Sequence, residues 1–315
     1  MQTVLVSAPY MIPFMNRFKP VLEEHGLVVI IADVLERLEE EDILKYSGQF
    51  DGSLCGDDQY TARALKACSP RLKVLSKWGT GIDSFDQEAA ANYGIKIYRT
   101  PNAFTLPVAD TVIAYMLSFA RQIPWMDHAV KNRRWKKFPS RSLSECTLGV
   151  IGVGNIGKAV IRRARAFGMQ ILANDIVEIA PDFIKENGLE MTELADLLER
   201  SDFVSINCDL NPTSFGLIND QTLSYMKQNA VLINTARGKI VKETALITAL
   251  NSGRISGAAL DVFEIEPLPS DSPLLEMDNV LLAPHNANSS PSAWERVHWN
   301  TIRNLLDGLN IPPSF

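Results

Sequence analysis

Arg237, Glu266 and His285 are the side chains of this sequence best suited to acid–base chemistry on a small carboxylate compound. Each stands just beyond a short apolar run of the chain. In a sheet of parallel strands, such positions meet at the carboxyl edge, where open α/β sheets bind ligands. There Arg237 could bind a carboxylate with a two-pronged hydrogen bond, and Glu266 could hold and charge His285 as a proton donor. A set of ordinary surface ion pairs is the alternative interpretation that this pattern leaves open.

The other three histidines have settings that need no chemistry. His25 precedes a glycine at a predicted helix end, where a partly charged imidazole suits the helix dipole. His128 stands beside a basic cluster and His298 lies inside the last predicted helix, which are surface or packing positions. The four cysteines are scattered without metal-type or redox-type spacing: Cys55, Cys68, Cys146 and Cys208. We therefore expect no metal site, no disulfide framework and a cytoplasmic location.

A glycine-rich segment, residues 152–157, directly follows one apolar run and directly precedes a helical pattern. Gly152 permits a tight turn, Gly154 lets the backbone approach a pyrophosphate, and Gly157 allows close packing of helix and strand. The helix that opens with Asn155 and Ile156 would then direct its positive end at the anion. Three glycines alone also suit a merely structural turn, but this strand–loop–helix context favours a dinucleotide.

Asp175 strengthens the dinucleotide interpretation and selects between two cofactors. It ends the next apolar run, 18 residues beyond Gly157, near the spacing of about 20 that is typical of a ribose-binding acid. The residues that follow it supply no cation for a 2′-phosphate, which Asp175 itself would repel. NAD is therefore the predicted cofactor, and a helix cap is the structural alternative for Asp175.

Length and charge limit the possible classes of protein. At 315 residues the chain exceeds the usual domain size of about 100 to 200 residues, so we expect two domains with a cleft between them. A formal net charge of −6 gives no general attraction for nucleic acid or an anionic membrane. Residues 131–137 place five cations around Trp135, but in an acidic chain we interpret this segment as solvated or as an interface, with Trp135 as a packing anchor. We expect neither a membrane span nor a signal peptide.

Short apolar runs alternate with helix-like segments from the first residue, which predicts an α/β fold with parallel sheets covered by helices. The first hundred residues contain five predicted strands, at 4–8, 27–32, 52–55, 72–76 and 95–98. A long helix is predicted to open near Thr105 and to end at Pro124. A second alternating set begins at Thr147, and a last helix covers 291–306 and stops at Gly308.

Three ordered blocks, residues 234–238, 259–267 and 283–285, give the sequence a specific resemblance. They read Asn-Thr-Ala-Arg-Gly, Ala-Leu-Asp-Val-Phe-Glu-Ile-Glu-Pro and Ala-Pro-His. With them the chain closely resembles the D-isomer-specific 2-hydroxyacid dehydrogenases, the family that includes phosphoglycerate, glycerate and D-lactate dehydrogenases. The resemblance covers nearly the whole chain.

The resemblance implies a role for each matching residue. Arg237 would anchor the substrate, His285 would act as acid or base, and Glu266 would be its partner. Asp261 would hold the nicotinamide amide, and Thr235 and Ala236 would also contact the cofactor. The backbone around three further residues would help to bind the substrate carboxylate: Gly79, Thr80 and Gly81.

The resemblance also implies two Rossmann-like or flavodoxin-like domains with a cleft between them. Residues 1–99 and 286–315 would form the substrate-binding domain, and residues 100–285 the NAD-binding Rossmann domain. Hinge motion would occur near 99–103 and 285–290, and two copies would form a homodimer. Several positions depart from the family pattern, notably Asn207, Asp209 and the residues after His285.

The predicted function is NAD-dependent 2-oxo acid reduction, or the reverse 2-hydroxy acid oxidation. A dinucleotide-sensing, corepressor-like binding protein is the alternative from another class, and Glu266 disfavours a formate dehydrogenase, which carries glutamine there. A small substrate without phosphate is expected, because residues 54–58 contain no cation. Arg71, Lys77 or Arg99 could still supply one after folding. The sequence predicts neither the substrate side chain nor the physiological direction.

Overall fold

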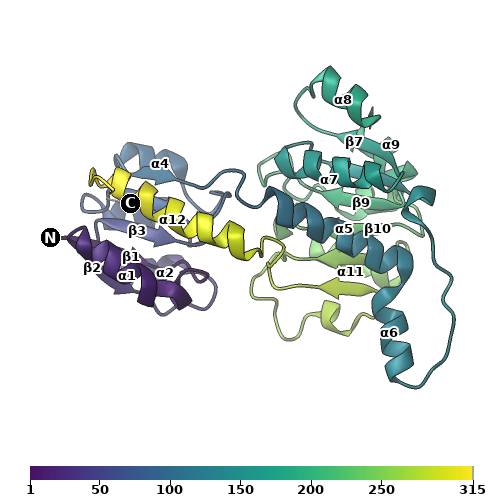
Figure 1. Ribbon diagram of the computed structural model, residues 1–315, viewed down its shortest axis with the longest axis horizontal. Helices are drawn as coiled ribbons and strands as arrows, with labels where there is room; N and C mark the ends of the chain where they lie inside the picture. The colour runs from purple at the N-terminus through teal and green to yellow at the C-terminus, as the bar shows by residue number, and fades with distance from the viewer. Residues whose placement is uncertain (314–315) are drawn as a thin grey trace. The chain divides into compact units, whose positions relative to one another are not determined.

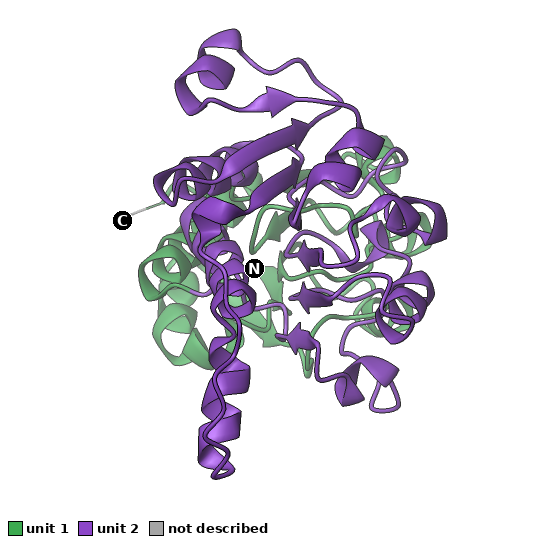
Figure 2. Ribbon diagram, turned by 90° about the vertical axis from the view of Figure 1, so that its right-hand side faces the viewer, with its two compact units in different colours: residues 1–104, 290–315 green, residues 105–289 purple. Residues whose placement is uncertain are grey.

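The computed structural model describes residues 1–313, which fold into two compact units. Unit 1 consists of Met1–Phe104 together with the chain from Ser290 onward, and unit 2 consists of Thr105–Ser289 (Figure 2). Each unit is built around its own parallel sheet. The prediction of an α/β protein with two parallel-sheet domains is therefore confirmed.

Within the described residues, the sheet of unit 1 has five parallel strands in the order β2-β1-β3-β4-β5 (Figure 1). The strands are β1 Gln2–Val6, β2 Leu27–Ile31, β3 Gly52–Cys55, β4 Val74–Lys77 and β5 Lys96–Tyr98. The α-helices around them are α1 Met15–Glu24, α2 Glu40–Lys45, α3 Ala62–Cys68, α4 Gln87–Asn92 and α12 Pro291–Gly308. This is the flavodoxin-like order, in which ligands bind at the switch point between β1 and β3.

Helix α12 brings the end of the chain back to the sheet of unit 1. The Ser76 hydroxyl donates a buried hydrogen bond of 2.7 Å to the Thr301 carbonyl. A Cβ atom on Gly52 would lie 2.6 Å from Cδ1 of Leu305, so glycine lets the helix pack directly on β3. Figure 1 shows this helix, in yellow, lying along the sheet of unit 1. The ends of the chain therefore share one core.

The described part of unit 2 contains a seven-stranded parallel sheet in the order β12-β11-β10-β9-β6-β7-β8. Its strands are β6 Thr147–Ile151, β7 Gln170–Asn174, β8 Glu190–Met191, β9 Phe203–Ile206, β10 Val231–Asn234, β11 Gly257–Leu260 and β12 Val280–Leu282. Its α-helices are α5 Thr105–Arg121, α6 Ile123–Lys131, α7 Asn155–Ala166, α8 Pro181–Asn187, α9 Leu194–Arg200, α10 Asp220–Tyr225 and α11 Glu243–Asn251. Strands β6 to β11 have the doubly wound order of dinucleotide-binding sheets, and β12 extends it at the β11 edge.

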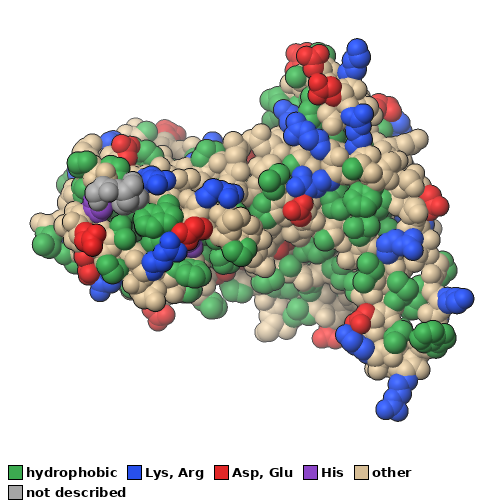
Figure 3. All heavy atoms as spheres, in the orientation of Figure 1, with side chains coloured by type: hydrophobic (Ala, Val, Ile, Leu, Met, Phe, Trp, Pro, Cys, Tyr) green, Lys and Arg blue, Asp and Glu red, His purple; other side chains and the backbone are tan. Residues whose placement is uncertain are grey.

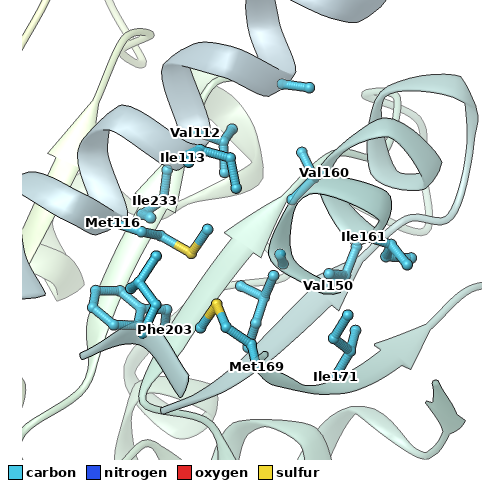
Figure 4. Packing of buried hydrophobic residues seen from close by; sticks show 14 of the residues in the cluster. Val112, Ile113, Met116, Val150, Val160, Ile161, Met169, Ile171, Phe203 and Ile233 are labelled. Carbon is cyan, nitrogen blue, oxygen red and sulfur yellow. The ribbon is translucent and has the colours of Figure 1, made fainter. Parts of the chain in front are cut away.

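The core of unit 2 fixes the strand and the helix on either side of the glycine loop. Figure 4 shows Met116 of α5 and Val160 of α7 among the side chains of Val150 and Ile233, which come from β6 and β10. All four are fully buried. Burying an aliphatic side chain of this size stabilises a fold by about 1.5 to 3 kcal/mol. The loop between β6 and α7 is therefore held between two well-packed elements.

The boundaries between the units fall a few residues beyond the predicted ones at 99/100 and 285/286. Thr100 belongs to unit 1 because its N–H donates to the Gly79 carbonyl at 2.8 Å. Asn286 and Ala287 belong to unit 2 because their N–H groups donate to the Asp261 carboxylate. Hydrogen bonds between residues distant in sequence set both boundaries, so periodicity alone could not place them.

The sequence predicted that Pro124 ends the long helix, but this residue lies near the start of the next helix, α6. Helix α5 already ends at Arg121, because Gln122 adopts a left-handed backbone with φ of 55°. Pro124 then lies in the first turn of α6, where its missing N–H costs no hydrogen bond.

No helix within residues 1–313 combines the length and the apolar character that a membrane span requires.

Candidate active site

The predicted site residues of unit 2 all lie beyond the carboxyl ends of its strands. The glycine loop, residues 152–157, follows β6, and Asp175 follows β7. Arg237 follows β10, while Glu266 and His285 come after β11 and β12. Because the strands are parallel, these loops share one edge of the sheet, the edge at which doubly wound proteins bind ligands.

The glycine loop has a backbone that larger residues could not adopt. Gly152 has a φ of +91°, and a Cβ atom there would lie 2.6 Å from the backbone nitrogen of Cys208. A Cβ atom on Gly157 would lie 2.0 Å from the Gly152 carbonyl oxygen. Helix α7 therefore starts in direct contact with the loop, and both glycines are needed for that contact.

The start of α7 fits an anionic group such as a pyrophosphate. The helix begins at Asn155 and Ile156, and its N-cap, Gly154, has no side chain to cover the first N–H groups. A Cβ atom on Gly154 would meet no heavy atom within 4 Å, so the space beside the loop is open. The positive end of a twelve-residue helix at this position suits a phosphate-bearing cofactor.

The Asp175 carboxylate is hydrogen-bonded to the glycine loop. One carboxylate oxygen accepts the Val153 N–H at 2.6 Å, and the other accepts the Val177 N–H at 3.0 Å. The acid therefore joins the end of β7 to the loop after β6, a role that neither the ribose-binding nor the helix-cap interpretation had included. Because each carboxylate oxygen can accept more than one hydrogen bond, a ribose contact remains compatible with this geometry and stays a prediction.

Glu266 and His285 are in direct contact, as the sequence had suggested. The Glu266 carboxylate lies 2.9 Å from Nδ1 of His285. Its other oxygen accepts the Phe263 N–H at 2.9 Å, which fixes the orientation of the carboxylate. The side chains of the pair are 18% and 20% exposed, so both remain accessible to a ligand. Holding Nδ1 in this way leaves Nε2 of His285 as the nitrogen that can exchange a proton with a substrate.

Asp261 positions His285 through the backbone, a role that sequence reasoning missed. Its fully buried carboxylate accepts the N–H groups of Asn286 and Ala287, each at 2.8 Å, and its carbonyl accepts the His285 N–H at 2.8 Å. His285 has a left-handed φ of 50°, a strained conformation that needs such support. Burial raises the pKa of Asp261, while the two backbone N–H groups oppose that rise. The predicted contact of Asp261 with the nicotinamide amide stays a prediction.

Asn234 shapes the turn that carries Arg237. Its buried side chain accepts the Ala236 N–H at 3.0 Å and donates to the Arg237 carbonyl at 2.9 Å. These bonds form the turn directly after β10, which ends at Asn234. The next residue, Gly238, packs so closely on Phe263 that a Cβ atom would lie 1.9 Å from its carbonyl. The strand-end loops that carry Arg237 and Glu266 are therefore in contact.

Thr235 and Ala236 differ in what they can offer a cofactor. The Thr235 hydroxyl is buried and has no hydrogen-bond partner among the described residues. An unpaired buried hydroxyl is costly, so its position suits a group that a ligand would bring. The Ala236 N–H already donates to Asn234 and its carbonyl accepts from Arg237. The glycine loop, the α7 terminus and Thr235 together fit a dinucleotide.

In unit 1, the predicted carboxylate-binding residues form the loop after β4. Gly79 has a φ of +132°, which favours glycine, and its carbonyl accepts the Thr100 N–H. The Thr80 hydroxyl donates to the Thr100 carbonyl at 2.9 Å, and Gly81 is partly exposed. The loop is thus fixed at the carboxyl edge of its sheet, and its contact with a substrate stays a prediction.

Comparison with known proteins identifies the family. Residues 113–287 match the family model of the D-isomer specific 2-hydroxyacid dehydrogenase, NAD binding domain. The chain is 41% identical over 255 residues to a glyoxylate reductase of Korarchaeum cryptofilum, covering 79% of this chain and 76% of the relative. It is 37% identical over 276 residues to a D-3-phosphoglycerate dehydrogenase of Methanocaldococcus jannaschii, covering 87% of this chain and 52% of that longer relative.

A crystal structure supports the same assignment. The D-lactate dehydrogenase of Aquifex aeolicus, complexed with NAD and lactic acid, superimposes with a TM-score of 0.84 at 29% identity. The alignment covers 99% of this chain and all of that one (100%). The sequence-based predictions of the family and of NAD as the cofactor are confirmed. The chain belongs to the D-isomer-specific 2-hydroxyacid dehydrogenases and is an NAD-dependent oxidoreductase of that family.

Proposed function

We propose that this protein reduces a small 2-oxo acid to the corresponding D-2-hydroxy acid, with NADH as the reductant. The contact of 2.9 Å between His285 and Glu266, at the ligand-binding edge of the NAD-binding sheet, is the observation that carries this proposal. The names of the relatives support a small substrate, because one is a glyoxylate reductase and another a D-3-phosphoglycerate dehydrogenase.

His285 has the part of proton donor in this proposal. When bound, NADH would supply the hydride that reduces the carbonyl carbon. His285 in its protonated form gives its Nε2 proton to the carbonyl oxygen as negative charge develops there, and in the reverse direction the neutral imidazole removes the hydroxyl proton. The Glu266 carboxylate stabilises the charged imidazole and keeps the ring oriented.

Arg237 and the loop of residues 79–81 have the part of substrate anchors. A guanidinium can bind a carboxylate with two parallel hydrogen bonds, which fixes the plane of the 2-oxo acid. The turn that Asn234 shapes aims Arg237 from the end of β10. Backbone amides of the loop from Gly79 to Gly81 are further candidate donors to a substrate carboxylate. Asp261 acts indirectly, by holding the backbone that carries His285.

A purified-enzyme assay tests the proposal. Glyoxylate, hydroxypyruvate, pyruvate and phosphohydroxypyruvate should each be offered with NADH, and NADH oxidation followed by absorbance. Turnover of at least one 2-oxo acid that yields the D-hydroxy acid is expected. Tight NADH binding without turnover of any of them would favour the alternative function of a dinucleotide-sensing binding protein.

We also propose that two copies of the chain form a homodimer through α6 and the segment after it. Trp135, which the sequence suggested as a packing anchor, is 90% exposed in the single chain, and Ile123 and Val130 of α6 are each more than half exposed. Figure 3 shows hydrophobic and basic side chains together over this region. Sedimentation of the wild type as a dimer, and weakened association of Trp135→Ser, are expected. A monomeric wild type would refute this assembly.

The cytoplasm is the location we propose. Cys55, Cys68 and Cys146 are buried free thiols, and burial raises the pKa of each, so they serve as small packing residues. Such thiols persist in a reducing compartment.

A further inference from the structure

An ion pair with a buried ammonium group lies at the carboxyl edge of the sheet in unit 1. Nζ of Lys77 lies 3.0 Å from the Asp57 carboxylate, and we call these two residues the Lys77–Asp57 pair. Lys77 ends β4, and it is aligned with Cys55, which ends the neighbouring strand β3 two residues before Asp57. The Lys77 side chain is only 4% exposed, whereas that of Asp57 is 30% exposed. The acid therefore covers the ammonium group and keeps part of its own surface open.

The pair adjoins the loop proposed to bind the substrate carboxylate. A Cβ atom on Gly79 would lie 3.6 Å from Nζ of Lys77, so the ammonium group is next to that loop. Asp57 comes from the loop after β3, at the β1–β3 switch point where sheets of this order bind ligands. Both members therefore occupy positions from which a substrate side chain can be recognised.

The loop that carries Asp57 is held in place by its neighbour Asp58. The buried Asp58 carboxylate accepts the Leu38 N–H at 2.7 Å and the Ser7 hydroxyl, which follows β1. Ser7 also donates its N–H to the Leu54 carbonyl of β3. Asp57 is thus presented by a rigid loop, so its carboxylate has a fixed position beside Lys77.

The two other candidate cations have different settings. Arg71 bonds to Asp51 and to the Thr3 hydroxyl, near the starts of β3 and β1, which places it at the opposite edge of the sheet. Arg99 is exposed and donates to the Thr80 carbonyl at 3.4 Å. Lys77 alone among the three is both buried and next to Gly79.

An ion pair that buries an ammonium group gives little net stability, because taking that charge out of water costs about as much free energy as its attraction to the carboxylate provides. We propose that the Lys77–Asp57 pair selects 2-oxo acids whose distal group is uncharged, such as hydrogen, methyl or hydroxymethyl, over those that carry a phosphate or a second carboxylate. This inference rests on the proposed function. Because Asp57 is the more exposed member of the pair, a distal anion would meet its carboxylate before it could reach Lys77. Two neighbouring negative charges repel each other. A distal hydroxyl, in contrast, could donate a hydrogen bond to Asp57.

Removing the charge of Asp57 should expose Lys77 to anionic substrates. For the wild type and Asp57→Asn, kcat/KM should be measured with hydroxypyruvate and glyoxylate, and with phosphohydroxypyruvate and oxaloacetate. The wild type should favour glyoxylate and hydroxypyruvate, whose distal groups are uncharged. In Asp57→Asn, the ratio of kcat/KM for the substrates with a distal anion to kcat/KM for these two should rise by about tenfold or more, since a hydrogen bond to a charged group becomes available.

Two double variants identify the cation that is responsible. The gain should disappear in Asp57→Asn with Lys77→Met and persist in Asp57→Asn with Arg99→Met. Asp42→Asn, which removes an exposed Lys–Asp pair of α2, is the matched control and should leave the ratio unchanged. If Asp57→Asn does not fold, Asp57→Ser is expected to give the same shift.

The outcomes separate this inference from the proposed function. Three results would overturn the role of the pair while 2-oxo acid reduction stands. They are a wild type that prefers substrates with a distal anion, a kcat/KM ratio that does not change in the Asp57 variants, and a gain with those substrates that persists when Lys77→Met is added. A wild type that reduces none of the four compounds would overturn the proposed function, and the inference with it.

Discussion

The carboxyl edges of the two sheets are built differently. In unit 2 the edge is a set of neighbouring turns, in which Asn234, Asp261 and Glu266 hold the backbone and side chains around Arg237 and His285. In unit 1 the edge is held by contacts between residues far apart in the chain, such as the 2.9 Å bond from Trp78 to His298. Hydrogen bonds between the loops of adjacent strands suit residues that must keep one exact geometry for proton transfer, whereas packing against a helix from the end of the chain suits a surface that defines a substrate's shape and charge.

An aromatic cluster illustrates the construction of unit 1. The Trp78 ring stacks on Tyr10 at 4.8 Å between centroids and contacts Phe104 and Trp294 at 5.5 and 5.8 Å. Burial lowers the pKa of His298 to about 4, so its neutral ring can accept the Trp78 N–H. Trp78 directly precedes Gly79, and the cluster therefore stiffens the loop proposed to bind the substrate.

The largest effect is expected from His285→Ala, which tests whether unit 2 carries the chemistry. Reduction of the preferred 2-oxo acid should fall by about 10² to 10⁴, the usual contribution of a general acid. NADH affinity, measured by fluorescence titration, should change little, because His285 has no proposed part in binding the cofactor. His128→Ala, in the exposed helix α6, is the control that should keep full turnover. Near-normal reduction by the His285 variant would contradict the mechanism.

Two glycines of the cofactor loop should give different defects. Gly157→Ala places a Cβ atom 2.0 Å from the Gly152 carbonyl oxygen, so we expect it to destabilise unit 2 by about 3 kcal/mol even without NADH. Gly154→Ala meets no atom within 4 Å and should keep its thermal stability. It should instead weaken NADH binding, because its methyl group would stand where the pyrophosphate approaches. Thermal unfolding without NADH and NADH titration distinguish the two, and equal Tm losses would refute the distinction.

Much of unit 2's site could be predicted from the sequence because its residues follow strands in short, specific blocks. The residues that ended in contact, Glu266 and His285, are 19 positions apart but lie beyond neighbouring strands. Asp261 was assigned to the cofactor alone, because no pattern shows that a carboxylate will turn back to the N–H groups of residues 286 and 287.

Unit 1 could be predicted less well, since its key contacts depend on packing. The absence of a cation in residues 54–58 suggested a substrate without phosphate, with Lys77 as one of three cations that folding could supply, and the structure places Lys77 beside Asp57. That pairing depends on the register of β3 with β4, which hydrophobic patterns do not give. The same holds for the contact of Ser76 with Thr301, because α12 could have packed on either sheet.

The variant Asp58→Asn tests how much the protonation of this buried carboxyl group contributes to the stability of unit 1. Burial raises the pKa of Asp58 from 3.8 to about 6, so the folded protein holds this proton more tightly than the unfolded chain does. The stabilisation that comes from binding this proton is therefore complete below about pH 4 and is lost as the pH rises through 6. The free energy of unfolding should fall by up to about 3 kcal/mol over this range. Asp58→Asn lacks this titration. The Tm difference between wild type and variant should change over pH 4 to 7 in that direction, and a constant difference would contradict it.

Glu266→Gln tests the electrostatic part of the His285 contact. Without the neighbouring carboxylate, the charged imidazole should lose its proton at lower pH. The fall of the 2-oxo acid reduction rate at high pH should then occur about one pH unit lower. At the acidic end of the range, the rate should stay measurable. Steady-state rates between pH 5 and 10 measure the shift. An unmoved basic limb would show that Glu266 acts only by orienting the ring.

The smallest effect is expected from the charge of Asp175, which should set the preference for NADH over NADPH. Its carboxylate also accepts the Val153 and Val177 N–H groups, so Asp175→Ala should both narrow the cofactor preference and loosen the glycine loop. Asp175→Asn keeps a side-chain oxygen that can accept one of these N–H groups but removes the negative charge that would repel a 2′-phosphate. Its kcat/KM with NADPH should therefore rise relative to NADH by a few-fold to about tenfold, with a smaller loss of NADH affinity than in the alanine variant. Comparing both cofactors in the three proteins separates charge from support of the loop. A wild type that prefers NADPH would show that Asp175 supports the loop without selecting the cofactor.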